Sequence, residues 1–262
     1  MFRGFTTAIR TLSILPAPGK DPERMSASLP WFPLVGLGLG YVAWGTGYGV
    51  MRASGDWAAG AAALSVLFGV VVTRALHVDG LADWADAVGC MGDREKRLRV
   101  MKDPSVGAFG VAAIAASLLL KYVALSRLFE LGAATWLVVA YVVSRAAQVE
   151  LASALPYARA EGGTAGGFVA GAGWPHRIVS AFLALAAAGL IAGPAGLATV
   201  VAGLVLARLF GLWCSSRLGG VTGDALGAAS ELVETGILCV TAAAATRLFQ
   251  YTGWDAVLRL VD

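Results

Sequence analysis

The stretch IVSAFLALAAAGLIAGPAGLATVVAGLVLA, residues 178–207, carries no charged side chain and decides the fold of this chain. About twenty apolar residues cross the hydrocarbon core of a bilayer as a helix, so this stretch is too long for one ordinary span. Gly193 and Pro194 stand at its midpoint, and both residue types interrupt helices. We therefore predict a hairpin of two membrane-spanning helices that turns at this dipeptide.

The overall composition agrees with a membrane protein. Of the 262 residues, 58% are hydrophobic and only 14% are charged, whereas about a quarter of the residues of a soluble domain are charged. The net charge of +3 is too small to indicate nucleic-acid binding. Cys90, Cys214 and Cys239 have no metal-like spacing, and we predict free thiols.

Following the charge-poor runs outward from the hairpin gives five further spans. They cover residues 30–51, 57–76, 108–128, 133–154 and 225–248. We therefore predict an all-α, polytopic bundle of about seven transmembrane helices, in a single domain over residues 1–262. Apolar residues near the start recur at helical period from Phe2 to Leu12. They predict a helix that lies on the membrane surface or packs on the bundle.

The positions of Lys and Arg predict the topology. These residues gather in the N-terminal segment and between residues 94 and 102, and cytoplasmic loops carry such an excess. With seven spans, loops 79–107, 157–177 and 217–224 then meet on the cytoplasmic side of the membrane. This convergence depends on the split at Gly193.

The first of these loops begins with three aspartates, Asp79, Asp83 and Asp86. The spacing puts all three on one face if the segment is helical. Mg²⁺ prefers carboxylate oxygens and keeps positions open for substrate phosphates, so it is the candidate cation. The alternative is a solvated, acidic helix start.

Other polar residues stand inside the predicted spans. Asp224, Glu231 and Glu234 share a helical face. The two glutamates fall within the predicted span 225–248, where carboxylates are functional candidates. The alternative for the two glutamates is an ion pair with Arg145 or Arg208. Arg145 itself either holds a phosphate or neutralises Glu150 on its own helix. The basic group Arg94, Lys96, Arg97 and Arg99 either fixes topology and binds lipid headgroups or contacts substrate.

Six motifs resemble the cobalamin synthase family, the adenosylcobinamide-GDP ribazoletransferases. They are FTTAIRTLSILPAP (5–18), FPLVGLGLG (32–40), HVDGLADWADA (77–87), RVMKDPSVGAFG (99–110), LPYAR (155–159) and GGVTGDALGAASELVE (219–234). The resemblance covers nearly the whole chain. The combination of HVDGLADWADA with MKDPSVGAFG is highly specific.

The resemblance implies a Mg²⁺-dependent enzyme of the bacterial cytoplasmic membrane with its active-site loops facing the cytoplasm. It would join α-ribazole or its 5′-phosphate to adenosylcobinamide-GDP, releasing GMP and adenosylcobalamin or its 5′-phosphate. The ribose 3′-hydroxyl would attack the phosphorus on the aminopropanol arm. Membrane lipid is an expected partner, and a homo-oligomer and contacts with other corrinoid-pathway enzymes stay open.

Site residues are assigned within this framework. The metal ligands are Asp79, Asp83, Asp86 and Asp224; the catalytic candidates are Asp103, His77 and Lys102; the substrate contacts are Arg145, Arg159, Arg217 and Ser105. Asp103 or His77 would take the proton from the nucleophile. The alternatives are another membrane phosphotransferase or prenyltransferase acting on a pyrophosphate, or a cation transporter using Glu231 and Glu234.

Overall fold

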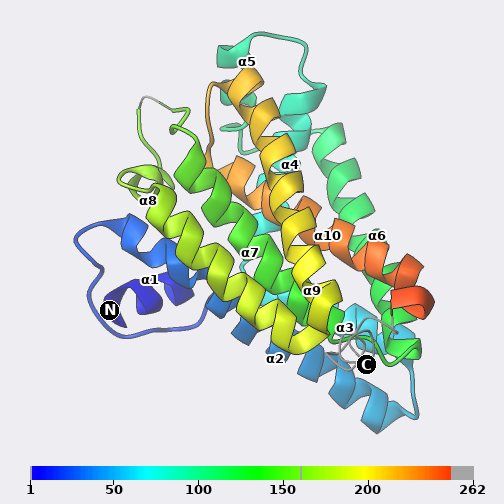
Figure 1. Cartoon of the computed structure of the whole chain (residues 1–262). Coiled ribbons are helices and arrows are strands. Elements are labelled where there is room, and N and C mark those ends of the chain that lie inside the picture. Colours follow the sequence, from blue (N-terminus) through cyan, green and yellow to red (C-terminus); the bar gives the residue numbers. More distant parts are fainter. Residues whose placement is uncertain (1, 160, 249–262) are drawn as a thin grey trace.

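The computed structural model describes residues 2–159 and 161–248, and in these ranges the chain is a bundle of helices (Figure 1). In chain order the elements are α1 (Phe2–Leu12), η1 (Met25–Trp31), α2 (Phe32–Ser54), α3 (Ala58–Val72), α4 (Leu76–Gly89), α5 (Arg94–Val100), α6 (Ala108–Glu130), α7 (Trp136–Ala154), α8 (Gly166–Val169), α9 (Trp174–Leu218) and α10 (Gly223–Leu248). The all-α prediction is confirmed. The predicted single domain continues to Asp262, but residues 249–262 lie outside the described ranges.

Helix α7 forms the centre of the bundle. Every residue from Trp136 to Ala152 is buried, and α2, α9 and α10 pack around the helix. Small residues allow the closest approach: a Cβ on Gly36 of α2 would lie 2.7 Å from the carbonyl oxygen of Tyr141. Because of this central position the helix is buried on every side, and its polar residues Arg145, Gln148 and Glu150 are buried with it.

The predicted count of seven spans is not confirmed. Five helices are long and apolar enough to cross a membrane, or six if the bent pair α3 and α4 forms one span. The predicted span 57–76 is wrong at its end, because α3 stops at Val72 and α4 leaves at an angle of 85°. Arg74 and Ala75 adopt positive φ values of 53° and 55° at the bend. No glycine or proline marks this break, so no local feature of the sequence predicts it.

The break inside the long apolar stretch is confirmed. Ala192 and Gly193 leave the helical conformation, and Gly193 has a φ of +56°, which glycine adopts without steric cost. A Cβ on Gly196 would lie only 2.1 Å from the carbonyl oxygen of Ala188. Figure 1 shows the two arms of α9 folding back on each other.

Helix α1 packs on the bundle, the second of the two alternatives predicted for it. Phe5 and Trp31 of η1 make an edge-to-face contact at 5.7 Å between ring centroids. Ala8 and Leu12 are fully buried. The helix therefore closes the cavity that the next section describes.

Candidate active site

Helix α4 and the start of α10 cross at two glycines. A Cβ on Gly80 would lie 2.6 Å from the carbonyl oxygen of Asp224, and a Cβ on Gly227 would lie 3.2 Å from that of Leu76. The predicted helix around the three aspartates is confirmed as α4. Asp83 lies within electrostatic range of Asp79 and Asp86 on its own helix and, because the two backbones touch, of Asp224. The sequence motifs 77–87 and 219–234 thus form one acidic site.

Asp86 differs from its neighbours in its contacts. Its two carboxylate oxygens accept hydrogen bonds from the backbone N–H groups of Gly107, at 2.7 Å, and Gly110, at 2.9 Å. Gly107 is the N-cap of α6, where backbone N–H groups lack helical partners. Asp86 therefore holds the loop of motif 99–110 against α4.

Arg159 connects the three predicted cytoplasmic loops. Its Nη2 donates to Asp224 Oδ2 at 2.6 Å and to the carbonyl oxygen of Met101 at 3.1 Å. The backbone adds a bridge between Tyr157 and Val221. Loops 79–107, 157–177 and 217–224 therefore meet, as the topology predicted, apart from Ala160, which lies outside the described residues.

A cavity of about 280 Å³ opens beside this acidic site. It is lined by Asp79 and Asp224, by His77, and by apolar residues of α1, η1 and α8 that include Leu12, Leu29 and Phe168. Gln148 of α7 also lines it. In the described part of the chain, His77 Nε2 and Gln148 Oε1 are buried without hydrogen-bond partners. The cavity thus combines an apolar wall with polar groups that are free to bind a ligand.

A second, more open and basic groove adjoins Arg159. It has a volume of about 550 Å³ and is lined mainly by Arg94, Arg99, Lys102, Arg159 and Glu161. Lys102 donates to Glu161 at 2.9 Å, and this hydrogen bond lowers the pKa of the Glu161 carboxyl. The excess of positive charge suits a phosphate-bearing ligand.

Asp103, Ser105 and Arg217 line neither cavity. Asp103 and Ser105 are exposed, and the Asp103 carboxylate accepts from the backbone N–H of Ser105 at 2.9 Å. Arg217 is exposed near the end of α9. The Asp103–Ser105 contact shapes the loop between α5 and α6, so their assignments as proton acceptor and substrate contact remain predictions, as does that of Arg217.

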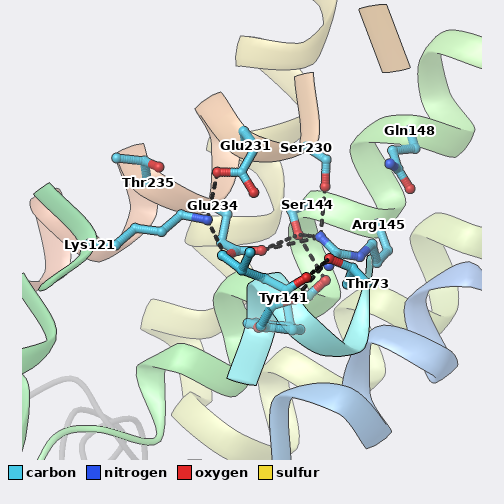
Figure 2. A network of polar contacts seen from close by, with 12 residues as sticks. Thr73, Lys121, Tyr141, Ser144, Arg145, Gln148, Ser230, Glu231, Glu234 and Thr235 are labelled. Atoms are coloured by element: carbon cyan, nitrogen blue, oxygen red, sulfur yellow. Dashed lines mark hydrogen bonds and ion pairs between the residues drawn. The ribbon is translucent and has the colours of Figure 1, made fainter. Parts of the chain in front are cut away.

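Arg145 belongs to a buried ionic network (Figure 2). Lys121 Nζ lies 2.7 Å from Glu231 Oε2 and 2.6 Å from Glu234 Oε1. Arg145 Nη1 lies 3.2 Å from Glu234 Oε2 and donates to Ser230 at 2.7 Å. The predicted ion pair with Arg145 is therefore confirmed for Glu234. Glu231 pairs instead with Lys121, a partner that the sequence did not indicate, and Arg208 pairs with Glu150.

Glu150 does not pair with Arg145. Its partners are Arg177, whose Nε lies 2.8 Å from Oε2, and the Nε of Arg208. Arg145 is thus held by Glu234 rather than by the glutamate on its own helix. The assignment of Arg145 as a substrate contact stays a prediction, and within the network its charge is neutralised by Glu234.

The donor set at the crossing suits magnesium. Within the described residues, no group of three His, Cys, Asp or Glu side chains is arranged to hold a metal ion by itself. Mg²⁺ usually takes only one or two carboxylates and completes its octahedron with water and substrate phosphates. Asp79 and Asp83, with Asp224 beside them, supply the hard oxygen ligands for such a site.

Two further residues have site contacts: Gln148, which was not assigned to the site, and Arg94, for which substrate contact was only one of two alternatives. Gln148 lines the cavity, and its signal was its place in an apolar span one helical turn from Arg145. Arg94 lines the basic groove and donates to the carbonyl oxygen of Ala158 at 2.9 Å. Arg94 stands in a run of cations next to a predicted span, and such a run is also typical of a residue that only fixes topology, so the sequence did not predict this contact.

Comparisons with known proteins agree with the motifs. The family model described as cobalamin-5-phosphate synthase matches residues 4–242. An adenosylcobinamide-GDP ribazoletransferase of Chlorobium phaeobacteroides is 46% identical over 239 residues, 88% of this chain and 94% of the relative. That of Chlorobium chlorochromatii is 47% identical over 240 residues, 90% and 94% of the two chains. No solved structure matches.

Proposed function

The chain belongs to the cobalamin-5-phosphate synthase family, and we propose that it transfers a ribazole nucleoside or nucleotide to adenosylcobinamide-GDP at the crossing of α4 and α10. It is a transferase of cobalamin biosynthesis, as are its curated relatives. The observation that supports the placement is the pair of contacts that Arg159 makes with Asp224 and Met101, which joins the three loops beside a cavity.

The reaction exchanges the phosphoanhydride bond of the GDP group for a phosphodiester bond. The ribose 3′-hydroxyl of the ribazole attacks the phosphorus on the aminopropanol arm of the corrinoid. The bond from that phosphorus to the bridging pyrophosphate oxygen breaks, and GMP leaves with the bonding electrons. Positioned cations stabilise the charge that develops on the leaving phosphate.

We assign the charged groups of the site to this exchange. Asp79 and Asp83, with Asp224, would hold Mg²⁺. The bound ion would neutralise negative charge on the pyrophosphate and on the leaving group. Arg159 and Lys102, at the basic groove, contact phosphate oxygens of the nucleotide. Asp86 positions the loop of α6.

His77 is the better placed of the two predicted proton acceptors. It lines the cavity beside Asp79, and its Nε2 has no partner in the described residues. Asp103 is exposed and occupied by the Ser105 amide. We therefore assign the proton of the attacking hydroxyl to His77.

The location follows from the apolar helices and the loops. The several apolar helices make this a multi-pass membrane protein. We propose the bacterial cytoplasmic membrane, with the three joined loops on the cytoplasmic side where the basic residues gather. Neighbouring corrinoid-pathway enzymes are candidate partners on that side.

The decisive experiment measures GMP release by the purified protein in detergent. Adenosylcobinamide-GDP is supplied with α-ribazole or with α-ribazole 5′-phosphate, in Mg²⁺ and then in EDTA. We expect GMP release that depends on Mg²⁺ and equals, mole for mole, the completed corrinoid formed. The nucleophile that gives the faster turnover is the preferred one. Equal turnover in EDTA would contradict the metal assignment while leaving the transferase intact. No turnover with either nucleophile would contradict the substrate assignment.

A further inference from the structure

A groove between the two arms of α9 lies outside the candidate active site. It has a volume of about 610 Å³ and, apart from Ala181, its apolar lining consists of Trp174, Ile178, Val201, Leu204, Val205 and Leu209. Most of these side chains are exposed; Trp174, for example, is 69% exposed. In a membrane-spanning hairpin such side chains face lipid.

A cluster of charges lies in this groove. Glu150 accepts from Arg177 Nε at 2.8 Å and pairs with Arg208 Nε. Both guanidiniums use only Nε in these pairs, and in the described residues their Nη groups have no protein partner. One carboxylate faces two guanidiniums, so the cluster has a net charge of +1. Such a cluster attracts a singly charged anion with oxygen acceptors.

The depth of the two arginines matches a lipid headgroup. Arg177 lies sixteen residues before Gly193 and Arg208 fifteen after it. At about 1.5 Å per helical residue, both guanidiniums are ~22 to 24 Å from the turn of the hairpin, near one edge of a hydrocarbon core about 30 Å thick. Trp174 lies one turn beyond Arg177, at the level where aromatic residues meet headgroups.

We propose that this groove binds one anionic glycerophospholipid. Its phosphate lies between the Nη groups of Arg177 and Arg208, and an acyl chain follows Ile178, Val201 and Val205 toward the turn. The net charge of the cluster selects a headgroup of net negative charge over a zwitterionic one, because the added ammonium of a zwitterion meets two guanidiniums. This site is independent of the proposed reaction.

The test is native mass spectrometry of the protein extracted from mixed vesicles of phosphatidylglycerol and phosphatidylcholine. The wild type should retain phosphatidylglycerol in preference to phosphatidylcholine. Arg177→Gln and Arg208→Gln should each reduce its retention about fivefold, since one cation near an anionic headgroup has roughly that effect. Val205→Trp fills the groove without changing its charge and should also remove the lipid.

Two matched variants control the experiment. Val240→Trp adds the same bulk at an exposed position of α10 outside the groove, and Arg52→Gln removes an exposed cation from the end of α2. Both should retain the lipid. Equal retention in Val205→Trp and Val240→Trp would overturn the proposal, as would equal binding of the two lipids. A dimer that Val205→Trp dissociates would assign the groove to a second copy instead and would also overturn it.

Discussion

The aspartates predicted as metal ligands have different contacts, which separates their expected effects. Asp83 has carboxylates as electrostatic neighbours, whereas Asp86 accepts two backbone hydrogen bonds from the start of α6. Asp83→Asn should reduce Mg²⁺-dependent GMP release about 10²-fold or more, as loss of one transition-state contact does, without lowering the thermal midpoint. Asp86→Asn should lower stability by about 1 kcal/mol or more, because the NH2 group of Asn replaces one of the two acceptors and leaves a backbone N–H without its partner.

GMP release and thermal unfolding in detergent check both variants. Because Asn keeps the size of Asp, a difference between the two sites reflects charge and capping rather than packing. A stable, active Asp83→Asn protein with unchanged Mg²⁺ dependence would refute the metal assignment of this residue.

The buried cations give a second prediction for single residues. Lys121 and Arg145 balance Glu231 and Glu234 inside the bundle. Lys121→Met leaves two buried carboxylates with one cation and should destabilise the protein by about 3 to 5 kcal/mol. The double variant Lys121→Met, Glu231→Gln restores the charge balance and should recover part of this loss. Thermal unfolding is the measurement.

Glu161→Gln is the matched control for the buried network. Glu161 is in loop 157–177, and its exposed carboxylate lies 2.9 Å from Lys102 Nζ. The substitution removes the charge of this carboxylate. No change of the thermal midpoint is expected, since exposed pairs contribute little. If Lys121→Met unfolds at the wild-type temperature, the network does not stabilise the bundle.

At the scale of helices, the glycines of the α4–α10 crossing determine how close the acidic groups lie. A methyl group on Gly80 of α4 would meet the carbonyl oxygen of Asp224 in α10 at 2.6 Å. Gly236, further along α10, has open space instead, because nothing lies within 4 Å of a Cβ placed there. Gly80→Ala should therefore separate the helices and reduce both activity and stability. Gly236→Ala should keep activity and gain up to about 1 kcal/mol from helix propensity.

A circular-dichroism melt and the GMP assay together test this pair. Retained activity in Gly80→Ala would mean that the close approach of α4 and α10 is not needed for catalysis. Loss of activity in both variants would mean that any methyl group on these helices is harmful.

The sequence predicted the helices better than their contacts. A charge-free run longer than one span, interrupted at Gly193, was enough to predict the break in α9. The period of Asp79, Asp83 and Asp86 was enough to predict one face of α4. The bend between α3 and α4 had no such signal, because the positive φ values there fall on Arg74 and Ala75 rather than on a glycine. Pairs such as Lys121 with Glu231 join residues far apart in the chain, and no spacing reveals them.

At the scale of the whole molecule, the contacts of Arg159 require that three loops lie on one side of the membrane. The guanidinium reaches both Met101 and Asp224, and Arg94 reaches Ala158. These contacts are possible only if the chain crosses the membrane an even number of times between one loop and the next. Loop 157–177 and Arg217 then lie on the same side of the membrane, and the two arms of α9 between them make two crossings.

Cysteine labelling in intact cells tests this arrangement. Single cysteines at Ser105 and Arg217, introduced after the three native cysteines are replaced by serine, should react with a membrane-impermeant maleimide only when the cytoplasmic side is opened. Ser54→Cys, exposed at the far end of α2, should react from outside in intact cells. Because both loop positions are exposed in the fold, lack of labelling would reflect the membrane barrier. Labelling of the two loop positions from opposite sides would mean that α9 crosses once and that the contact of Arg159 with Asp224 does not form in the membrane.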